Sequence, residues 1–420
     1  MRGTMNHRPV TVFALLSVLS ASPVRAEEAR DPIPAGVPVA EAAKRGDVQA
    51  QFKLGVMYDL GQDVARDDEE AAHWYRKAAE KGHAGAQYSL GELYRKGRGV
   101  PQDLKQTVAW YRRAAEQGHV KAQVSLGFMY LYALGVAEDK PKAAQWFRKA
   151  AEAGDAVGQY NLGALYKEGM GVKQDDKEAL HWLKEAAAQG DASAQLGLGE
   201  MYALGDGVPQ DDAQAVEWFR KSAAQGNAHA QFTLGYSYEE GRGVAKDATQ
   251  ALDWYRQAAE GGDADACYNL GLMYMEGQSV GKDEKTAFQW FDKAAAHGHG
   301  MAMFNLGVMY RKGLGVPQDI NQALDWYRRA AGRGVANAQL VLGTMYAEGI
   351  GVDQDNVQAL RWLDLAAEQG LDKAQAGREK LLMAMTPSQI AEARKSADRD
   401  TAEKKPAGKA APKSPEKKGE

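Results

Sequence analysis

The sequence predicts an all-α solenoid of nine stacked helix-turn-helix repeats, each 36 residues long. The first observation is a Leu-Gly-x-x-Tyr motif, which recurs with a step of 36 residues from Leu54 to Leu342 without insertion or deletion. The second is that all nine tryptophans lie at one phase of this period, from Trp74 to Trp362. The third is an aspartate at another fixed phase, first seen at Asp67. Two short helices cannot bury these aromatic side chains alone, so the repeats are expected to stack.

The N-terminal segment, residues 1–26, has the layout of a secretory signal peptide. A basic start is followed by an apolar run from Val10 to Leu19 and by small residues before a cut expected after Ala26. The apolar run is about half the roughly 20 residues that a membrane helix needs, so we expect no integral membrane segment in the mature chain. We therefore expect a periplasmic or secreted protein, in which residues 27–39 form a linker.

The first helix of each repeat is predicted from an apolar face, which Ala50, Leu54 and Tyr58 form in repeat one. Asp47 stands where an N-cap residue is expected. Other repeats place these residues at the same phase: Asp155, Asp191, Asn227, His83, His119 and His299. Gly55 lies in the middle of this helix, where glycine costs about 1 kcal/mol relative to alanine. Because this cost recurs in all nine repeats, we expect a neighbouring helix to approach too closely for a Cβ atom.

The second helix is predicted to begin at the periodic aspartate. A Glu or Gln follows three residues later in seven of nine repeats, which indicates a capping box. The tryptophan is expected to fill the core between helices, as part of an apolar stripe that includes Trp74 and Tyr75. A Gly-x-Gly-Val turn such as residues 97–100 joins the two helices. With a half-repeat before and a degenerate repeat after as caps, the solenoid is expected to span residues 40–385.

The C-terminal sequence predicts a short helix followed by a tail. Thr386 can cap a helix over residues 386–400 that has Pro387 at its first position. Residues 401–420 hold six lysines and three prolines without aromatic or β-branched apolar residues, so this Lys/Pro/Ala tail is expected to be disordered. A solvated spacer is one interpretation of the tail. Weak contact with an anionic envelope surface is the other.

Composition and motifs argue against several classes of function. With 52 basic and 56 acidic residues, the net charge of -4 lacks the cationic surface that nucleic-acid binding needs. The single cysteine, Cys267, cannot form an intramolecular disulfide or a thiolate zinc site. A Gly-x-Ser-x-Gly string places Ser279 in a turn between helices, whereas a nucleophile elbow follows a strand. His297 and His299 flank another turn without a supporting metal motif. We therefore expect no catalytic, metal-binding or cofactor-binding residues.

At the level of whole repeats, sequences such as residues 86–119 resemble Sel1-like repeats, which are close relatives of tetratricopeptide repeats. The resemblance covers about residues 40–385. It implies a right-handed α/α superhelix, a role in assembling protein complexes and, in bacteria, frequent export. One exported, Cys-rich branch of the family is associated with penicillin binding and β-lactamase activity. The repeats of that branch carry paired cysteines, whereas this chain has Cys267 alone.

The positions that vary between repeats indicate a binding surface. In related solenoids, the residue after the Leu-Gly pair and the two residues after the tyrosine face the concave groove. There the chain places apolar side chains in two clusters, which we expect to lie about 30 Å apart and to bind a peptide. The candidate partner-binding residues are Phe128, Leu131 and Tyr132 in repeat three, with Tyr236, Leu272 and Met275 in repeats six and seven. The basic pairs Arg95–Lys96 and Arg311–Lys312 flank these clusters.

The leading hypothesis is therefore an exported, non-enzymatic scaffold that binds a polypeptide in its groove, within envelope regulation or assembly. The alternative is a hydrolase of cell-wall or β-lactam substrates, by analogy with the Cys-rich branch. A scaffold for an exported polysaccharide is a third hypothesis.

Overall fold

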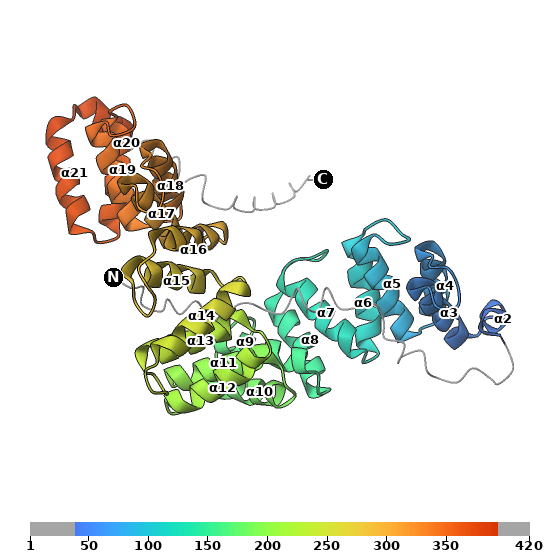
Figure 1. Ribbon diagram of the computed structural model, residues 1–420. Coiled ribbons are helices and arrows are strands. Elements are labelled where there is room, and N and C mark those ends of the chain that lie inside the picture. The colour runs from blue at the N-terminus through green and yellow to red at the C-terminus, as the bar shows by residue number, and fades with distance from the viewer. Residues whose placement is uncertain (1–37, 394–420) are drawn as a thin grey trace, which may run out of the picture. The chain divides into compact units, whose positions relative to one another are not determined.

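The computed structural model describes residues 38–393, and every regular element in this range is an α-helix (Figure 1). The all-α repeat fold predicted from the sequence is confirmed. The chain divides into two compact units, of which the first ends at Lys246 and the second begins at Asp247. The sequence analysis does not anticipate this division. The expected signal peptide and C-terminal tail lie outside the described residues.

The first unit starts with the short helix α2 (Val39–Lys44), which packs on the first repeat as a cap. Its first helices are α3 (Val48–Leu60), α5 (Ala84–Lys96), α7 (Val120–Leu131), α9 (Ala156–Glu168), α11 (Ala192–Leu204) and α13 (Ala228–Glu240). Its second helices are α4 (Asp68–Glu80), α6 (Leu104–Glu116), α8 (Lys140–Glu152), α10 (Asp176–Ala188) and α12 (Asp212–Ala224).

The second unit begins with a second helix. Its second helices are α14 (Ala248–Glu260), α16 (Glu284–Ala296), α18 (Ile320–Gly332) and α20 (Asn356–Glu368). Its first helices are α15 (Ala264–Glu276), α17 (Gly300–Lys312), α19 (Ala336–Glu348) and the capping helix α21 (Asp372–Ala384). A further helix occupies residues 387–393, and Thr386 caps it by accepting a hydrogen bond from the Gln389 amide at 3.3 Å. Within each unit, consecutive helices pack side by side (Figure 1).

The mid-helix glycines allow the close approach that the sequence predicts. A Cβ atom placed on Gly55 would lie 2.6 Å from the Tyr75 ring, and one on Gly271 would lie 2.5 Å from the Phe291 ring. These rings belong to the second helix of the same repeat. Within each unit, the two helices of a repeat therefore meet where glycine replaces a larger residue.

The tryptophans are less buried than the sequence analysis expects. Only Trp74 and Trp110 are buried, and the other seven are half-buried. The residue that follows each tryptophan is the one enclosed in the core, as Tyr75 and Phe147 illustrate. In several repeats a cation covers the tryptophan ring, with the Lys221 ammonium 3.9 Å from the centre of the Trp218 ring. The assignment of tryptophan as the central core residue is therefore wrong.

The helix caps confirm one prediction and correct another. Each periodic aspartate caps its second helix, and Asp67 accepts hydrogen bonds from the amides of Glu69 and Glu70 at 3.0 Å. The Glu70 carboxylate, however, accepts a hydrogen bond from the Trp74 indole at 3.0 Å. The predicted capping box is therefore wrong for this repeat, because the Asp67 amide that would donate to Glu70 donates to the Tyr58 carbonyl oxygen at 3.0 Å.

The second glycine of each turn fixes the stacking of successive repeats. A Cβ atom on Gly99 would lie 1.8 Å from the Asp68 carbonyl oxygen, at the start of the preceding second helix. Gly99 also has a φ of +63°, which favours glycine. At this phase the chain has two other residue types, Asp63 with a φ of 59° and Ser279 with a φ of 62°. Repeat one has no full repeat before it, so the turn at Asp63 meets no preceding second helix.

Candidate functional site

The candidate surface lies on the first helices of the repeats. We define the first-helix face as the four positions that Phe52, Lys53, Val56 and Asp59 occupy in repeat one, with their equivalents 36 residues apart. In the first five repeats most of this face is buried, and Ser125 and Asn161 show that even its polar side chains are enclosed. The face therefore offers little apolar surface to a partner in these repeats.

Two of the candidate partner-binding residues belong to this buried part. Phe128 is fully buried and packs edge-on against Phe147, with ring centres 5.0 Å apart, and Leu131 is buried as well. Their expected exposure is wrong, because the core of repeat three encloses both side chains. Tyr132 is 38% exposed and stacks on Phe128 with ring centres 6.3 Å apart. Whether any of the three contacts a partner stays a prediction.

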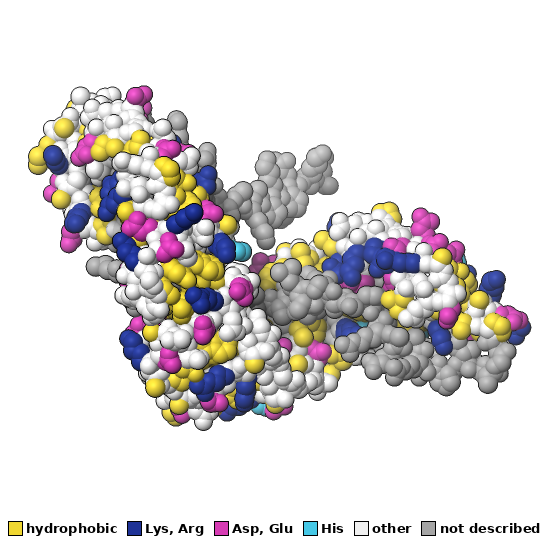
Figure 2. All heavy atoms as spheres, in the orientation of Figure 1, with side chains coloured by type: hydrophobic (Ala, Val, Ile, Leu, Met, Phe, Trp, Pro, Cys, Tyr) yellow, Lys and Arg dark blue, Asp and Glu magenta, His cyan; other side chains and the backbone are white. Residues whose placement is uncertain are grey.

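The other three candidates retain partial exposure. Tyr236 is half-buried in the first unit, whereas Leu272 and Met275 are half-buried in the second unit. The expected cluster of these residues thus falls on two units, and only Leu272 and Met275 share a helix, α15. On the face of the molecule drawn in Figure 2, hydrophobic side chains reach the surface over α15 and α16, beside Lys and Arg side chains.

Two sets of inter-repeat hydrogen bonds were missed by the sequence analysis. In one set, an arginine of a second helix donates to the hydroxyl of the motif tyrosine 18 residues later, as from Arg76 to Tyr94 at 3.0 Å. In the other, a glutamine of a first helix donates to an alanine carbonyl eight residues earlier, as from Gln87 to Ala79 at 3.0 Å. The constant spacing of each pair is visible in the sequence and was the signal available. Both sets show that the residues at these recurrent positions hold the scaffold together. These positions are therefore not assigned to partner binding.

Ion pairs neutralise much of the charge on the first unit's face. Arg98 contacts Asp59 at 2.7 Å and Asp68 at 2.5 Å, which joins two repeats. The hydrogen bond from Arg98 lowers the pKa of the Asp68 carboxyl to about 2. Glu92 holds both Arg95, at 2.8 Å, and Lys96, at 3.2 Å.

The residues considered for chemistry occupy structural positions. Ser279 lies in the turn between α15 and α16, where no strand precedes it. The Cys267 thiol is buried, which raises its pKa, at the phase where other repeats carry the bonding glutamine. His299 caps α17 by accepting from the Ala302 amide at 3.0 Å, as predicted. Over residues 38–393, no three His, Cys, Asp or Glu side chains gather as a metal site would require.

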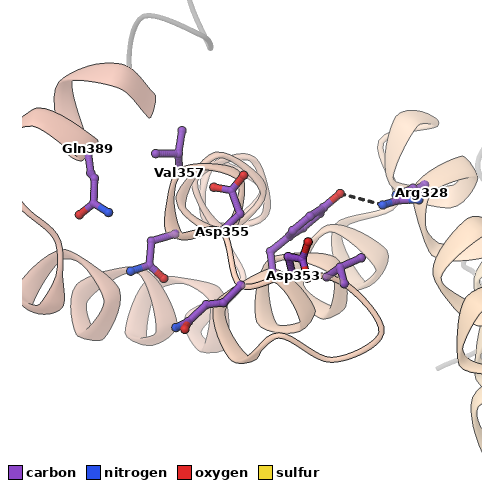
Figure 3. Close-up of a pocket in the computed structure, with 9 residues that line it drawn as sticks. Arg328, Asp353, Asp355, Val357 and Gln389 are labelled. Carbon is purple, nitrogen blue, oxygen red and sulfur yellow. Dashed lines mark hydrogen bonds between the residues drawn. The ribbon is translucent and has the colours of Figure 1, made fainter.

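A pocket of about 480 Å³ opens at the last repeat (Figure 3). Its lining comprises Arg328, Tyr346, Val352, Asp353, Gln354, Asp355, Asn356, Val357 and Gln389. In other repeats, except repeat six, which is followed by Ser279, the start of the second helix receives the turn glycine of the next repeat. Here Pro387 takes that phase and begins a helix, so the space beside Asn356 is unfilled. The lining has no nucleophile beside a base, and Arg328 donates to the Tyr346 hydroxyl at 3.0 Å.

Stacked helix pairs of this kind define an α-solenoid repeat protein. The Sel1 repeat family model matches nine consecutive segments of 36 residues from residue 48 to residue 371, and the chain belongs to this family. Proteins built from Sel1 repeats generally act as protein-interaction scaffolds, and their fold is typically non-catalytic.

Two solved structures resemble the chain over most of its length. A protective antigen present in uropathogenic Escherichia coli strains, which displays an SLR fold, is 35% identical, with 90% of this chain and 91% of that chain covered and a TM-score of 0.54. A Sel1 repeat protein from Oxalobacter formigenes is 33% identical, with 82% of this chain and 95% of that chain covered and a TM-score of 0.62. No curated protein matches the chain.

Between residues 38 and 393, none of the helices combines the length and the apolar character needed to cross a bilayer.

Proposed function

We propose that this chain is an exported, non-enzymatic scaffold that binds a polypeptide partner on its first-helix face, in envelope regulation or assembly. One observation carries the proposal. Second helices, turns and helix caps form the contacts that stack the repeats, whereas the residue after the invariant Leu-Gly pair changes from Leu272 to Val308 to Thr344 on the same framework, and all three are half-buried. Repeat solenoids use extended surfaces of this kind for binding, with the framework held constant.

Export is supported by the N-terminal sequence. The basic start, the short apolar run and the small residues before Ala26 favour removal of a signal peptide and location in the periplasm or outside the cell. Mass spectrometry of the protein from fractionated cells tests this: we expect a mature N-terminus at Glu27 in an exported fraction. An intact Met1 in the cytoplasm contradicts export while leaving the scaffold proposal in place.

The scaffold function is tested by chemical crosslinking in intact cells, followed by mass spectrometry. We expect crosslinks from first helices to one reproducible protein. Crosslinks confined to second helices would contradict the proposed face. Labelling by a fluorescent penicillin, lost on changing a serine such as Ser279→Ala, would instead support the hydrolase alternative.

A further inference from the structure

The first-helix face of the second unit differs from that of the first unit in its exposure. Of its positions only Tyr268 is buried, and the remainder are half-buried or exposed. The full set is Tyr268, Asn269, Leu272, Met275, Phe304, Asn305, Val308, Arg311, Leu340, Val341, Thr344 and Ala347. A partner can therefore reach side chains here that are enclosed in the first five repeats.

The central residues of this face are apolar. Leu272 on α15 and Val308 on α17 both follow the invariant Leu-Gly pair, and both are half-buried. Met275 lies about one turn further along α15. The two helices are linked at this face, because Tyr268 stacks on His299, the cap of α17, with ring centres 4.3 Å apart. Half-buried aliphatic side chains on linked helices suit the apolar side chains of a bound segment.

An amide group stands beside these apolar residues. Asn269 is half-buried, and its side chain makes no hydrogen bond with any other described residue. An asparagine amide offers both donors and an acceptor, so it can pair with the peptide group of an extended chain. In the first unit the equivalent Asn161 is fully buried and donates to the Val157 carbonyl at 2.7 Å, so that amide is already used.

The basic pair at the end of α17 supplies the strongest contrast. Repeats two and eight share the sequence Tyr-Arg-Lys-Gly, but Glu92 binds both Arg95 and Lys96 in repeat two. Repeat eight has Val308 at the phase of Glu92. Arg311 and Lys312 are exposed, and neither makes an ion pair within the described part of the chain. The same four-residue motif therefore presents two available cations only in the second unit.

We propose that the first-helix face of α15 and α17 binds an extended peptide segment in which apolar residues are followed by aspartate or glutamate. This inference rests on the scaffold function proposed above. Leu272, Met275 and Val308 contact the apolar side chains, Asn269 pairs with the peptide backbone, and Arg311 with Lys312 binds the acidic residues. First helices about 10 Å apart would be spanned by about three extended residues per repeat.

The charge of Arg311 and Lys312 indicates which kind of segment binds to this face. An acidic segment complements the two cations, whereas the chain's own residues 401–420 carry six lysines against three glutamates and would be repelled. The basic tail is therefore excluded as the bound segment, and the proposed occupant is a segment of a partner protein.

The test is selection from a library of random dodecapeptides displayed on phage, with the full chain as bait. Enriched peptides are then synthesised with a fluorophore, and their binding is measured by anisotropy. We expect enrichment of acidic residues next to Leu, Ile or Val. The double variant Arg311→Ser with Lys312→Ser should weaken binding at least about fivefold, and Leu272→Ser should weaken it similarly.

The matched control is Arg95→Ser with Lys96→Ser, which removes the same charge from the same motif and should change the affinity less than about twofold. Circular dichroism melts verify that each variant is folded. Peptides that lack acidic residues, or that bind the Arg311 and Lys312 variant equally well, overturn the inference but leave the scaffold proposal intact. Absence of any enrichment counts against both. Equal competition by a single-stranded DNA oligonucleotide also overturns the inference, because it indicates a general anion surface.

Discussion

The two units are built alike inside and differ on the first-helix face. Both enclose an aromatic or aliphatic side chain after each tryptophan, and both bring a mid-helix glycine against it, as with Gly127 and Phe147 or Gly271 and Phe291. On the first-helix face, the first five repeats bury most positions, whereas the second unit leaves nearly all of them accessible. The repeat sequence thus determines the contact between its own two helices more strictly than it determines how exposed the side chains of the first-helix face are.

The basic motif shared by repeats two and eight shows that the charge of the first-helix face also varies while the packing inside the repeat is constant. Arg95 and Arg311 have the same local sequence, and the carbonyl of each accepts a hydrogen bond at 2.9 Å from a turn glutamine, Gln102 or Gln318. One residue a turn earlier, Glu92 or Val308, decides whether the cation is neutralised. A repeat array can therefore change its binding surface by single substitutions that leave the packing intact.

The largest expected effect tests whether the two cores are equivalent. Phe147→Ala in the first unit and Phe291→Ala in the second should each lower the free energy of unfolding by about 3 to 5 kcal/mol, because both rings are fully buried. Urea unfolding of each variant, followed by circular dichroism, measures the loss. A much smaller loss for Phe291→Ala would show that the accessible surface of the second unit extends into its core.

Two adjacent residues of α12 give a more specific test of which side chain forms the core. Phe219 is buried, whereas Trp218 is half-buried under Lys221. Phe219→Ala should therefore destabilise the protein more than Trp218→Ala, despite the larger size of tryptophan. The reverse order in urea unfolding would restore tryptophan as the principal core residue.

The period of the sequence was sufficient to predict the helices, their aspartate caps and the function of Gly55. These features depend on contacts within one repeat or between adjacent repeats, so they recur at fixed phases. The choice between Trp218 and Phe219 was beyond the pattern, because adjacent residues on a helix both border the apolar stripe and tertiary packing decides which one is enclosed.

The sequence pattern also could not predict which of the candidate site residues are exposed. Phe128 and Leu272 occupy the same phase, yet Phe128 is buried and Leu272 is half-buried. The difference depends on the neighbours rather than on the residue's own position in the repeat, since Tyr132 stacks on Phe128 where repeat seven has Glu276 at the same phase. Sequence variation identified the variable positions, but only the structure distinguishes the enclosed ones from the accessible ones.

The turns provide the second expected effect. In Gly135→Ser, the new Cβ atom would lie 2.3 Å from the Leu104 carbonyl oxygen at a positive φ, so we expect a loss of at least about 2 kcal/mol. In the second unit, Ser279 already occupies this phase. Ser279→Gly should raise stability by at most about 1 kcal/mol, because relief of the left-handed backbone is offset by a more flexible unfolded chain.

The urea unfolding midpoints of the two turn variants measure these changes in stability. A loss on Ser279→Gly comparable to that of Gly135→Ser would mean that the serine side chain makes a required contact and that the turns of the two units are not equivalent.

The third expected effect compares the two arginines directly. Arg95 donates to both oxygens of Glu92, at 3.0 and 2.8 Å, and Glu92 also accepts from the buried Tyr111 hydroxyl. Burial opposes ionisation of Glu92, but the hydrogen bonds from Arg95 and Tyr111 and the charges of Arg95 and Lys96 together outweigh it and lower the pKa of this carboxyl. Arg95→Gln should therefore cost about 1 to 3 kcal/mol, whereas Arg311→Gln should change stability by less than about 0.5 kcal/mol. Thermal melts at neutral pH measure both, and equal losses would refute the claim that Arg311 is available for binding.

The smallest expected effect is the pH dependence that the pair of Arg98 and Asp68 gives to the first unit. Arg98 lowers the pKa of Asp68 to about 2, below the value of about 3.9 expected in the unfolded chain. The unfolded chain therefore binds more protons between these values, so the ion pair stabilises the protein above about pH 4 and this stability is lost as the pH falls toward 2. Asp68 remains partly exposed to solvent, which limits the effect to less than about 1 kcal/mol.

The second unit has Gln278, Leu314 and Ile350 at the phase of Arg98, so it cannot form this pair. Hydrogen exchange between pH 4 and pH 2, corrected for the intrinsic exchange rate, should show protection falling more in α4 and α5 than in α16 and α17. Arg98→Gln should flatten this dependence in α4 and α5, because Asp68 then returns toward its unfolded pKa, and should leave α16 and α17 unchanged. If wild type and variant lose protection in parallel as the pH falls, acid acts on some other carboxylate, and the link between the first two repeats does not depend on the charge of Asp68.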